Sequence, residues 1–129
     1  MTEMNAIVLE FVEEGNEKAD LLEHHLILLE KSPASQELLV EVFRALHTIK
    51  GATSFLGFTK LCGLAHTGES LLARLRDGGL AINQEIITAL LSLVDAIREM
   101  LSDISATGQE GKRDYGALMN SLNRFQKAS

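Results

Sequence analysis

A histidine, a lysine and a glycine lie within about one helical turn of each other in ALHTIKGATSFLGF, residues 45–58. His47 precedes Lys50 by three positions and Gly51 by four, so in a helix the three share one side. An exposed imidazole is a good nucleophile near neutral pH, because its ordinary pKa is about 6.5. A glycine one turn away leaves the ring open, although glycine in mid-helix costs about 1 kcal/mol relative to alanine. The segment therefore predicts a nucleophilic histidine.

Two further residues that could support a reacting histidine, His66 and Glu69, lie on the next expected helix. His47 lies about 12 Å before the end of its expected helix and Glu69 about 15 Å after the start of the next, so antiparallel packing brings them to one height. His47 and Glu69 each lie about 100° from the apolar stripe of their helix, so we expect both at the surface. Whether they meet depends on which way the helices are wound.

The chemistry of such a group suits phosphoryl transfer. A carboxylate that accepts a hydrogen bond from Nδ1 leaves the Nε2 lone pair pointing outward, and it steadies the positive charge that develops when Nε2 attacks phosphorus. Lys50 would balance the charge of the arriving phosphoryl oxygens. A histidine, a glutamate, a lysine and a cleared glycine position are what a phosphoryl-accepting histidine requires.

Other interpretations of the histidines are open. A histidine on a helix shoulder is commonly a solvated side chain, and His24 and His25 fit that description, with His25 expected to tuck partly into its helix face. A ferritin-like metal site needs Glu-x-x-His on two helices plus two further glutamates, whereas this chain has one reversed His-x-x-Glu at 66–69. Zinc held by His47, the histidine of that motif and Cys62 would be an unusual set. We therefore expect no metal.

The elements that would carry these residues are five helices, because apolar residues recur at three- and four-residue steps and no segment shows strand alternation. The expected helices run from about Asn5 to Glu30, from Gln36 to Phe55, from Thr59 to the DGG turn at 77–79, from Gln84 to Ile104, and over about 114–126. Long amphipathic helices joined by short loops predict an all-α fold, an antiparallel up-and-down four-helix bundle over about 5–105. The short fifth helix should pack on an end or a side, and residues 1–129 are expected to form a single domain.

Local signals mark the turns between these helices. Pro33 ends the first helix and Gly57 forms the turn after the second. Thr59 is the expected N-cap of the third helix and Asn83 that of the fourth. The segment SATGQEGK, residues 105–112, is expected to be a short flexible link.

Composition excludes several classes of protein. The net charge is −6 with no basic stripe, which argues against a nucleic-acid partner. The single cysteine cannot form an internal disulfide, which suits a reducing compartment. The first residues lack the basic region of a signal peptide, and no apolar run is long enough to span a bilayer. We expect a soluble cytoplasmic protein and, because no coiled-coil seam is present, a monomer.

The stretch VFRALHTIKGATSFLGFTKL, followed by His-Thr-Gly-Glu at 66–69, resembles the histidine phosphotransfer (HPt) domain found in CheA-type chemotaxis histidine kinases. The DGG turn and the helix headed by Asn83 also fall where that family has them, so the resemblance covers nearly the whole chain. Residues 52–54 read Ala-Thr-Ser, where the family commonly has smaller residues. The first helix carries Gly15 and Lys18, where acidic and leucine-rich sequence is commoner. These departures bear on partner preference.

The resemblance implies a role for each candidate residue. His47 would be the phosphoryl acceptor, Glu69 would hydrogen-bond its ring, and Lys50 and His66 would support the site. Receiver domains would approach the face formed by the first two helices. A CheA-type kinase catalytic domain, in the same chain or another, would phosphorylate His47, and an aspartate of a CheY-like response regulator would receive the phosphoryl group.

By itself the chain is not expected to be an enzyme, although it would be part of a protein-histidine kinase. It carries no Gly-rich nucleotide loop of the G-x-G-x-x-G or G-x-x-x-x-G-K type, so ATP and Mg²⁺ would belong to partner domains and no cofactor would bind here. Two alternatives stay open. One is a stand-alone phosphorelay HPt protein, and the other is a structural or adaptor bundle whose histidine is idle.

Overall fold

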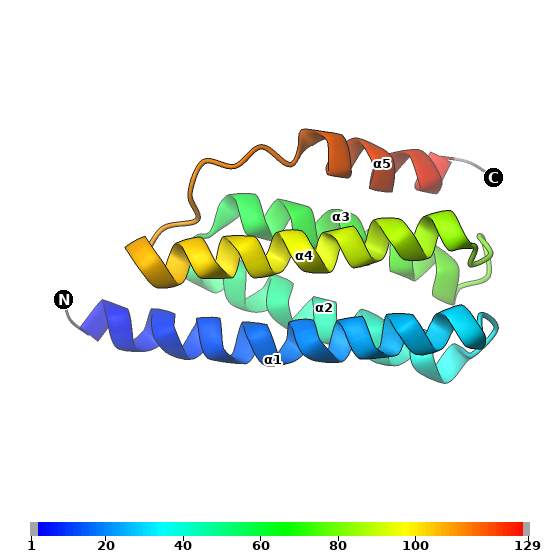
Figure 1. Ribbon diagram of the computed structural model, residues 1–129, viewed down its shortest axis with the longest axis horizontal. Helices are drawn as coiled ribbons and strands as arrows, with labels where there is room; N and C mark the ends of the chain where they lie inside the picture. Colours follow the sequence, from blue (N-terminus) through cyan, green and yellow to red (C-terminus); the bar gives the residue numbers. More distant parts are fainter. Residues whose placement is uncertain (1–2, 128–129) are drawn as a thin grey trace.

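The computed structural model describes residues 3–127, and within them it contains five helices and no strand (Figure 1). The helices are α1 (Glu3–Lys31), α2 (Gln36–Leu56), α3 (Thr59–Arg76), α4 (Gln84–Thr107) and α5 (Gly116–Lys127). Each of the first four runs antiparallel to the one before it. The prediction of an all-α up-and-down bundle with a short additional C-terminal helix is therefore confirmed, with helix ends that differ from the expected ones by a few residues.

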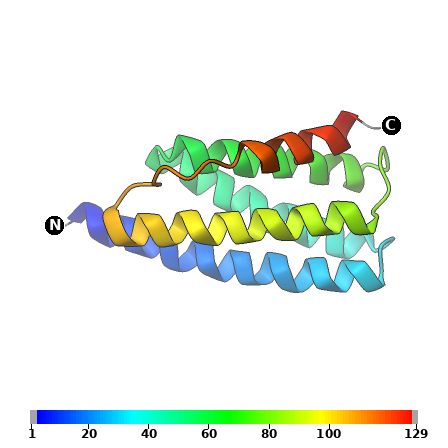
Figure 2. The same ribbon diagram turned by 45° about the horizontal axis from the view of Figure 1, so that its top comes forward.

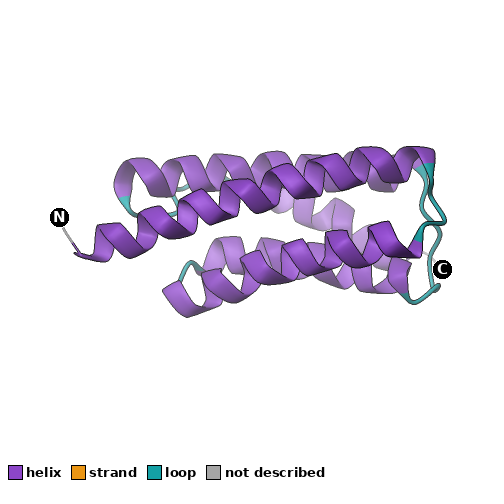
Figure 3. Ribbon diagram, turned by 90° about the horizontal axis from the view of Figure 1, so that it is seen from below, coloured by secondary structure: helices purple, strands orange, loops and turns teal. Residues whose placement is uncertain are grey.

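The four long helices form a ring in which each packs on its neighbours. α1 contacts α2 and α4, and α3 contacts the other side of each of these two helices. Figure 3 shows the bundle from below, with the helices aligned along one direction. α5 lies outside the ring and packs on the side formed by α3 and α4, which Figure 2 shows clearly. Over residues 3–127 no helix is both long enough and apolar enough to cross a bilayer.

Leucine, isoleucine and valine from the first four helices fill the core. The apolar stripes predicted for α1, α3 and α4 are buried, and removing each large side chain from water contributes about 1.5–3 kcal/mol. These stripes comprise Val8, Phe11, Leu22, Leu26 and Leu29 on α1, Leu61, Leu64, Ala65, Leu71, Leu72 and Leu75 on α3, and Ile86, Leu90, Leu93, Ile97, Leu101 and Ile104 on α4. Two residues of the α2 stripe differ, because Phe43 and Leu56 are only partly buried. On α5, Leu122 is the buried residue, and the other apolar side chains cover the bundle at its edge. The fold is thus held by one core with α5 laid against it.

The starts of α2 and α4 are each capped by the side chain of the residue directly before the helix. Ser35 Oγ accepts a hydrogen bond from the backbone N–H of Leu38 at 3.2 Å, which caps α2. Asn83 Oδ1 accepts from the N–H of Ile86 at 2.8 Å, which confirms it as the N-cap of α4. Gly57 ends α2 with a φ of 83°, a left-handed conformation that suits glycine.

The start of α3 differs from the prediction. Thr59 is the first helical residue and not the N-cap, and Phe58, which occupies the cap position, makes no side-chain cap bond. Instead the carboxylate of Glu110 accepts hydrogen bonds from the N–H groups of Lys60 at 3.0 Å and Leu61 at 2.8 Å. A negative charge there also suits the helix dipole. The cap comes from far along the chain, so no local pattern could have shown it.

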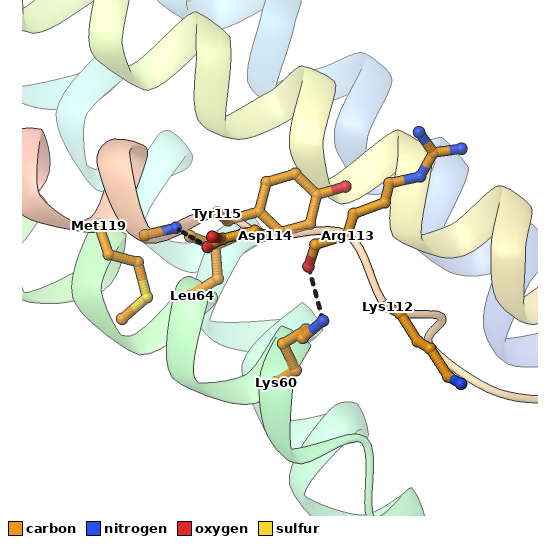
Figure 4. Close-up of a pocket in the computed structure, with 8 residues that line it drawn as sticks. Lys60, Leu64, Lys112, Arg113, Asp114, Tyr115 and Met119 are labelled. Carbon is orange, nitrogen blue, oxygen red and sulfur yellow. Dashed lines mark hydrogen bonds between the residues drawn. The ribbon is translucent and has the colours of Figure 1, made fainter.

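The segment between α4 and α5 is tied to the bundle at several points, which lie just after residues 105–112. Lys60 Nζ donates a hydrogen bond to the backbone carbonyl of Arg113 at 2.6 Å (Figure 4). Arg113 Nε donates to Asp103 at 3.0 Å, and the hydroxyl of Tyr115 donates to Glu99 at 2.8 Å. Burial, reinforced by the bond to Glu99, raises the pKa of the Tyr115 hydroxyl. The link therefore joins α3, α4 and α5.

Candidate functional site

The side chain of Glu69 joins α3 to α2 at the centre of the predicted site. Its Oε2 lies within hydrogen-bond distance of His47 Nδ1, and its Oε1 accepts a hydrogen bond from Lys50 Nζ at 2.5 Å. The residue is only 7% exposed. The expectation that Glu69 lies at the surface is therefore wrong. One buried carboxylate holds two side chains of the neighbouring helix.

The burial of Glu69 follows from the residue before it. A Cβ added at Gly68 would lie 2.4 Å from Cδ2 of Leu93 and 3.0 Å from Cδ2 of Leu46. The glycine therefore lets α3 approach the leucines of α2 and α4 closely, and this close approach draws Glu69 into the seam between α2 and α3. Sequence reasoning missed this role. The available signal was a glycine in mid-helix directly beside a candidate site residue, where it costs about 1 kcal/mol relative to alanine.

The hydrogen bonds determine which nitrogen of His47 is free. Burial acts to raise the pKa of the Glu69 carboxyl, but the hydrogen bonds from Lys50 and His47 outweigh it, so the pKa lies below its ordinary value. An ionised carboxylate can only accept, so in the neutral ring of His47 the proton lies on Nδ1 and the lone pair on Nε2. The His47 side chain is 61% exposed. Nε2 is thus the basic nitrogen of the ring, and the exposed side chain leaves it accessible.

Lys50 and His66 border the same site in different ways. Lys50 is bound to Glu69 yet keeps a quarter of its side chain exposed. Nδ1 of His66 lies 3.9 Å from Glu69 Oε1, which is too long for a hydrogen bond, and its side chain is 65% exposed. A hollow between α2 and α3, whose lining includes Lys50, Ser54 and His66, opens beside them. His66 therefore lies at the rim of the site, outside its hydrogen-bonded set.

Gly51 is exposed, one turn after His47 on α2. A Cβ added there would meet no atom within 4 Å. A methyl group at this position would therefore not touch the ring of His47, so the space that the glycine leaves clear lies toward solvent. Internal packing does not require glycine at this position.

The other histidines and the alternative metal site have different surroundings. His24 is exposed and His25 is half-buried, and Nδ1 of His25 lies 2.9 Å from the carbonyl oxygen of Leu21 in its own helix. This agrees with the expectation that His25 tucks partly into α1. In the part of the chain that the structure describes, no three side chains of His, Cys, Asp or Glu converge as a metal ion would need.

Comparison with known families assigns the four-helix bundle to one family. The family model described as the Hpt domain matches residues 6–107, which covers α1 to α4. The chain belongs to the Hpt domain family. α5 lies beyond the matched range.

The similar proteins are chemotaxis kinases and their domains. The chain is 34% identical over 115 residues to the chemotaxis protein CheA of Borreliella burgdorferi, which covers 89% of this chain but 13% of that protein. It therefore spans a small part of this curated relative. The phosphorylated P1 domain of CheA3 in complex with CheY6 from R. sphaeroides matches with a TM-score of 0.86 and 28% identity, covering 97% of this chain and 99% of that one. A histidine phosphotransfer domain of CheA matches with a TM-score of 0.86 and 31% identity, covering 97% of this chain and 93% of that one.

Proposed function

We propose that this chain is the phosphoryl-carrying domain of a CheA-type chemotaxis signalling kinase. His47 accepts the phosphoryl group from ATP bound to a separate kinase catalytic domain and passes it to an aspartate of a CheY-like response regulator. The observation that carries the proposal is the buried Glu69 carboxylate, which binds His47 Nδ1 and leaves Nε2 exposed with its lone pair. The similarity to a P1 domain whose structure includes CheY6 supports the class of partner.

In the first step Nε2 of His47 attacks the γ-phosphorus of ATP. An N–P bond forms, the bond from phosphorus to the bridging oxygen breaks, and ADP leaves with the electron pair. Nδ1 keeps its proton, so the ring becomes cationic while the ionised Glu69 carboxylate lies against it. Lys50, held beside the same carboxylate, balances the phosphoryl oxygens.

In the second step a carboxylate oxygen of the response regulator attacks the same phosphorus atom. The N–P bond breaks, its electron pair returns to Nε2, and the ring is neutral again. Glu69 then holds the same tautomer as before, so His47 is ready for another cycle. ATP, Mg²⁺ and the accepting aspartate all belong to partner domains in this scheme.

The decisive experiment mixes the chain with a CheA-type kinase core and labelled ATP. We expect label on His47, lost on brief acid treatment because the bond is a phosphoramidate. His47→Gln should abolish labelling, while His66→Gln and His24→Gln should retain it. Full labelling of His47→Gln would overturn the assignment and make His66 the candidate acceptor.

The response regulator should dock over the exposed side of His47 and reach parts of α1 and α2. We expect a small and transient contact. Addition of a CheY-like receiver to isotope-labelled protein should shift backbone NMR signals near His47, Lys50 and Ser54. Shifts confined to α4 and α5 would contradict this mode of docking.

A further inference from the structure

The hydrogen bond to Glu69 fixes only one atom of the His47 ring. The outer torsion of a histidine side chain has broad preferences, so coupled changes of its two side-chain torsions can tilt the ring while Nδ1 keeps its partner. Because 61% of the side chain is exposed, neighbouring atoms enclose it only in part. The direction of the Nε2 lone pair therefore depends on a second contact that sets the plane of the ring.

The ring of Phe43 provides such a contact. Phe43 precedes His47 by four residues on α2, so the two side chains lie on the same face of the helix. Their ring centroids are 6.0 Å apart and their planes differ by only 8°. This is the range of offset-stacked pairs, which are worth more than the area they bury. Phe43 falls in the apolar stripe of α2 but is only partly buried, so one part of its ring is available to His47.

Phe43 is itself held by α3. The Cζ atom of Arg76 lies over the Phe43 ring, 4.5 Å from its centroid, in cation–π geometry. Nε of Arg76 also donates to Asp77 Oδ1 at 3.1 Å, which restrains the guanidinium. Glu69 and Arg76 are two turns apart on one face of α3, as Phe43 and His47 are one turn apart on α2. The antiparallel helices thus make two matched contacts, Glu69 with His47 and Arg76 with Phe43.

We propose that Phe43 is a positioning residue for phosphoryl transfer, which sets the plane of the His47 ring, and that Arg76 acts through Phe43. The inference rests on the proposed function of His47. Glu69 selects the nitrogen that reacts, and Phe43 selects the direction in which its lone pair points. Since an in-line attack on phosphorus tolerates little misalignment, loss of the stacked ring should slow the reaction while the acceptor itself stays intact.

The plain alternative is that Phe43 only fills space at the edge of the core. In that case its replacement would change stability and leave the reactivity of His47 unaltered. Phe11 offers a matched comparison, because it is a buried aromatic residue that stacks on Phe58 with centroids 5.6 Å apart, in a different part of the bundle. Phe11→Leu should lower the melting temperature without changing the rate of phosphorylation at His47.

The test measures phosphorylation of His47 with two donors. Phosphoramidate transfers its phosphoryl group to Nε2 with cleavage of its own P–N bond and release of ammonia, so it needs no partner protein. A CheA-type kinase core with ATP is the second donor. Both rates are followed on the NMR signals of the His47 ring, for the wild type and for Phe43→Leu, Phe43→Tyr and Phe11→Leu.

We expect Phe43→Leu to slow phosphorylation about tenfold with either donor, less than the roughly 10²-fold that a 1 Å misplacement can cost. Phe43→Tyr keeps a planar ring and should restore the rate to within about twofold of the wild type. Phe43→Leu should also move the chemical shifts of the His47 ring protons, which lose the shielding of the parallel ring. Equal rates for Phe43→Leu and the wild type, or a Tyr variant as slow as the Leu variant, would overturn the proposal.

Arg76 is tested by coupling. Arg76→Met should reduce the rate less than Phe43→Leu, and the double variant should be no slower than Phe43→Leu alone, because Arg76 acts through the ring. Fully additive losses would overturn that part of the proposal. The donors also separate this inference from the proposed function. Wild-type protein that reacts with phosphoramidate but takes no label from the kinase core would contradict the proposed function, whereas the Phe43 comparison would still stand or fall on the phosphoramidate rates.

Discussion

Gly68 on α3 and Gly51 on α2 are both mid-helix glycines beside the site, yet their surroundings are opposite. Gly68 is buried, with no room for a Cβ between Leu46 and Leu93, whereas a Cβ at Gly51 would meet nothing. Their site neighbours differ in the same way, since Glu69 is buried and the His47 side chain is mostly exposed. Packing therefore accounts for the α3 side of the site. On the α2 side, packing does not account for Gly51 or for the exposed edge of His47, and both face whatever approaches from outside.

This difference predicts that substitutions on the two sides change different quantities. On α3 they should lower the free energy of unfolding, with loss of reactivity where the carboxylate is changed. On α2 they should leave the bundle intact and affect the transfer reactions. Substitutions at Glu69, Gly68 and Gly51 test that separation.

Replacement of Glu69 should have the largest effect. Glu69→Gln keeps the side-chain volume but removes the charge that steadies the cationic ring, so phosphorylation by a kinase core should fall by about 10²–10⁴-fold. Because the carboxylate is buried and bound to Lys50, the free energy of unfolding should also drop, by about 1.5–2 kcal/mol, at the lower end of the usual range for hydrogen bonds to charged groups. A time course of phosphoryl labelling measures the rate, and urea denaturation measures the free energy of unfolding.

The control for Glu69 is Glu85→Gln, which removes an exposed carboxylate from the first turn of α4. It should leave phosphorylation unchanged. If Glu69→Gln and Glu85→Gln were phosphorylated at equal rates, His47 would work without an orienting partner, and the distinction between the two sides of the site would fail.

Gly68→Val should be the most damaging change to stability alone. The added atoms would overlap the side chains of Leu93 and Leu46, and the free energy of unfolding should fall by about 2–3 kcal/mol, toward the upper end for overpacked cores. Gly63→Val on the same helix is the matched control, because a Cβ there meets no atom within 4 Å. Urea denaturation of both variants decides the point, and equal stabilities would contradict the close approach inferred at Gly68.

Gly51→Ala should act in the opposite direction on stability. Alanine favours the helix, so the free energy of unfolding should rise by up to about 1 kcal/mol. Transfer from phosphorylated His47 to a CheY-like receiver should become slower, because the methyl group occupies the open space beside the exposed ring. Thermal denaturation and a transfer time course measure the two effects. A less stable Gly51→Ala variant would show that packing, after all, governs this side of the site.

The smallest expected effect is the loss of stability at acidic pH, when the Glu69 carboxylate becomes protonated. The pKa of Glu69 is lowered in the folded protein, so its ionised form contributes stability at pH values above the ordinary glutamate pKa of about 4.3. That contribution is lost as the pH falls through the lowered pKa. The difference in urea midpoint between the wild type and Glu69→Gln should therefore narrow between pH 6 and pH 2, by about 1 kcal/mol or less in free energy. A difference that stayed constant would contradict the ionised carboxylate.

Sequence periodicity predicted the five helices well because each long helix must bury a stripe, and the stripe repeats with the helix itself. The caps supplied by Ser35 and Asn83 also lie beside the helices that they start, so they can be recognised locally. Thr59 was misread for the opposite reason. The group that caps α3 comes from Glu110, and a contact between distant segments depends on the completed fold.

Periodicity brought His47, Lys50, His66 and Glu69 to one level but gave the wrong exposure for Glu69. A helical wheel treats each helix alone, whereas the depth of Glu69 depends on how closely α3 approaches its neighbours at Gly68. The parallel rings of Phe43 and His47 were not predicted, although their four-residue spacing was visible. The spacing of residues shows which side chains of one helix can touch. Which of these contacts form depends on how the neighbouring helix packs.

The carboxylate that completes the first turn of α3 has a consequence for the order of folding. Lys60 and Glu110 are separated by 50 residues, and during synthesis the ribosome releases the chain from its N-terminus at about 5–20 residues per second. After α3 has been synthesised, the amide groups of its first turn therefore lack their partner, Glu110, for several seconds. The amides of Lys60 and Leu61 thus gain their carboxylate partner only after residue 110 has been synthesised, whereas the bonds within α3 need no residue beyond the helix itself.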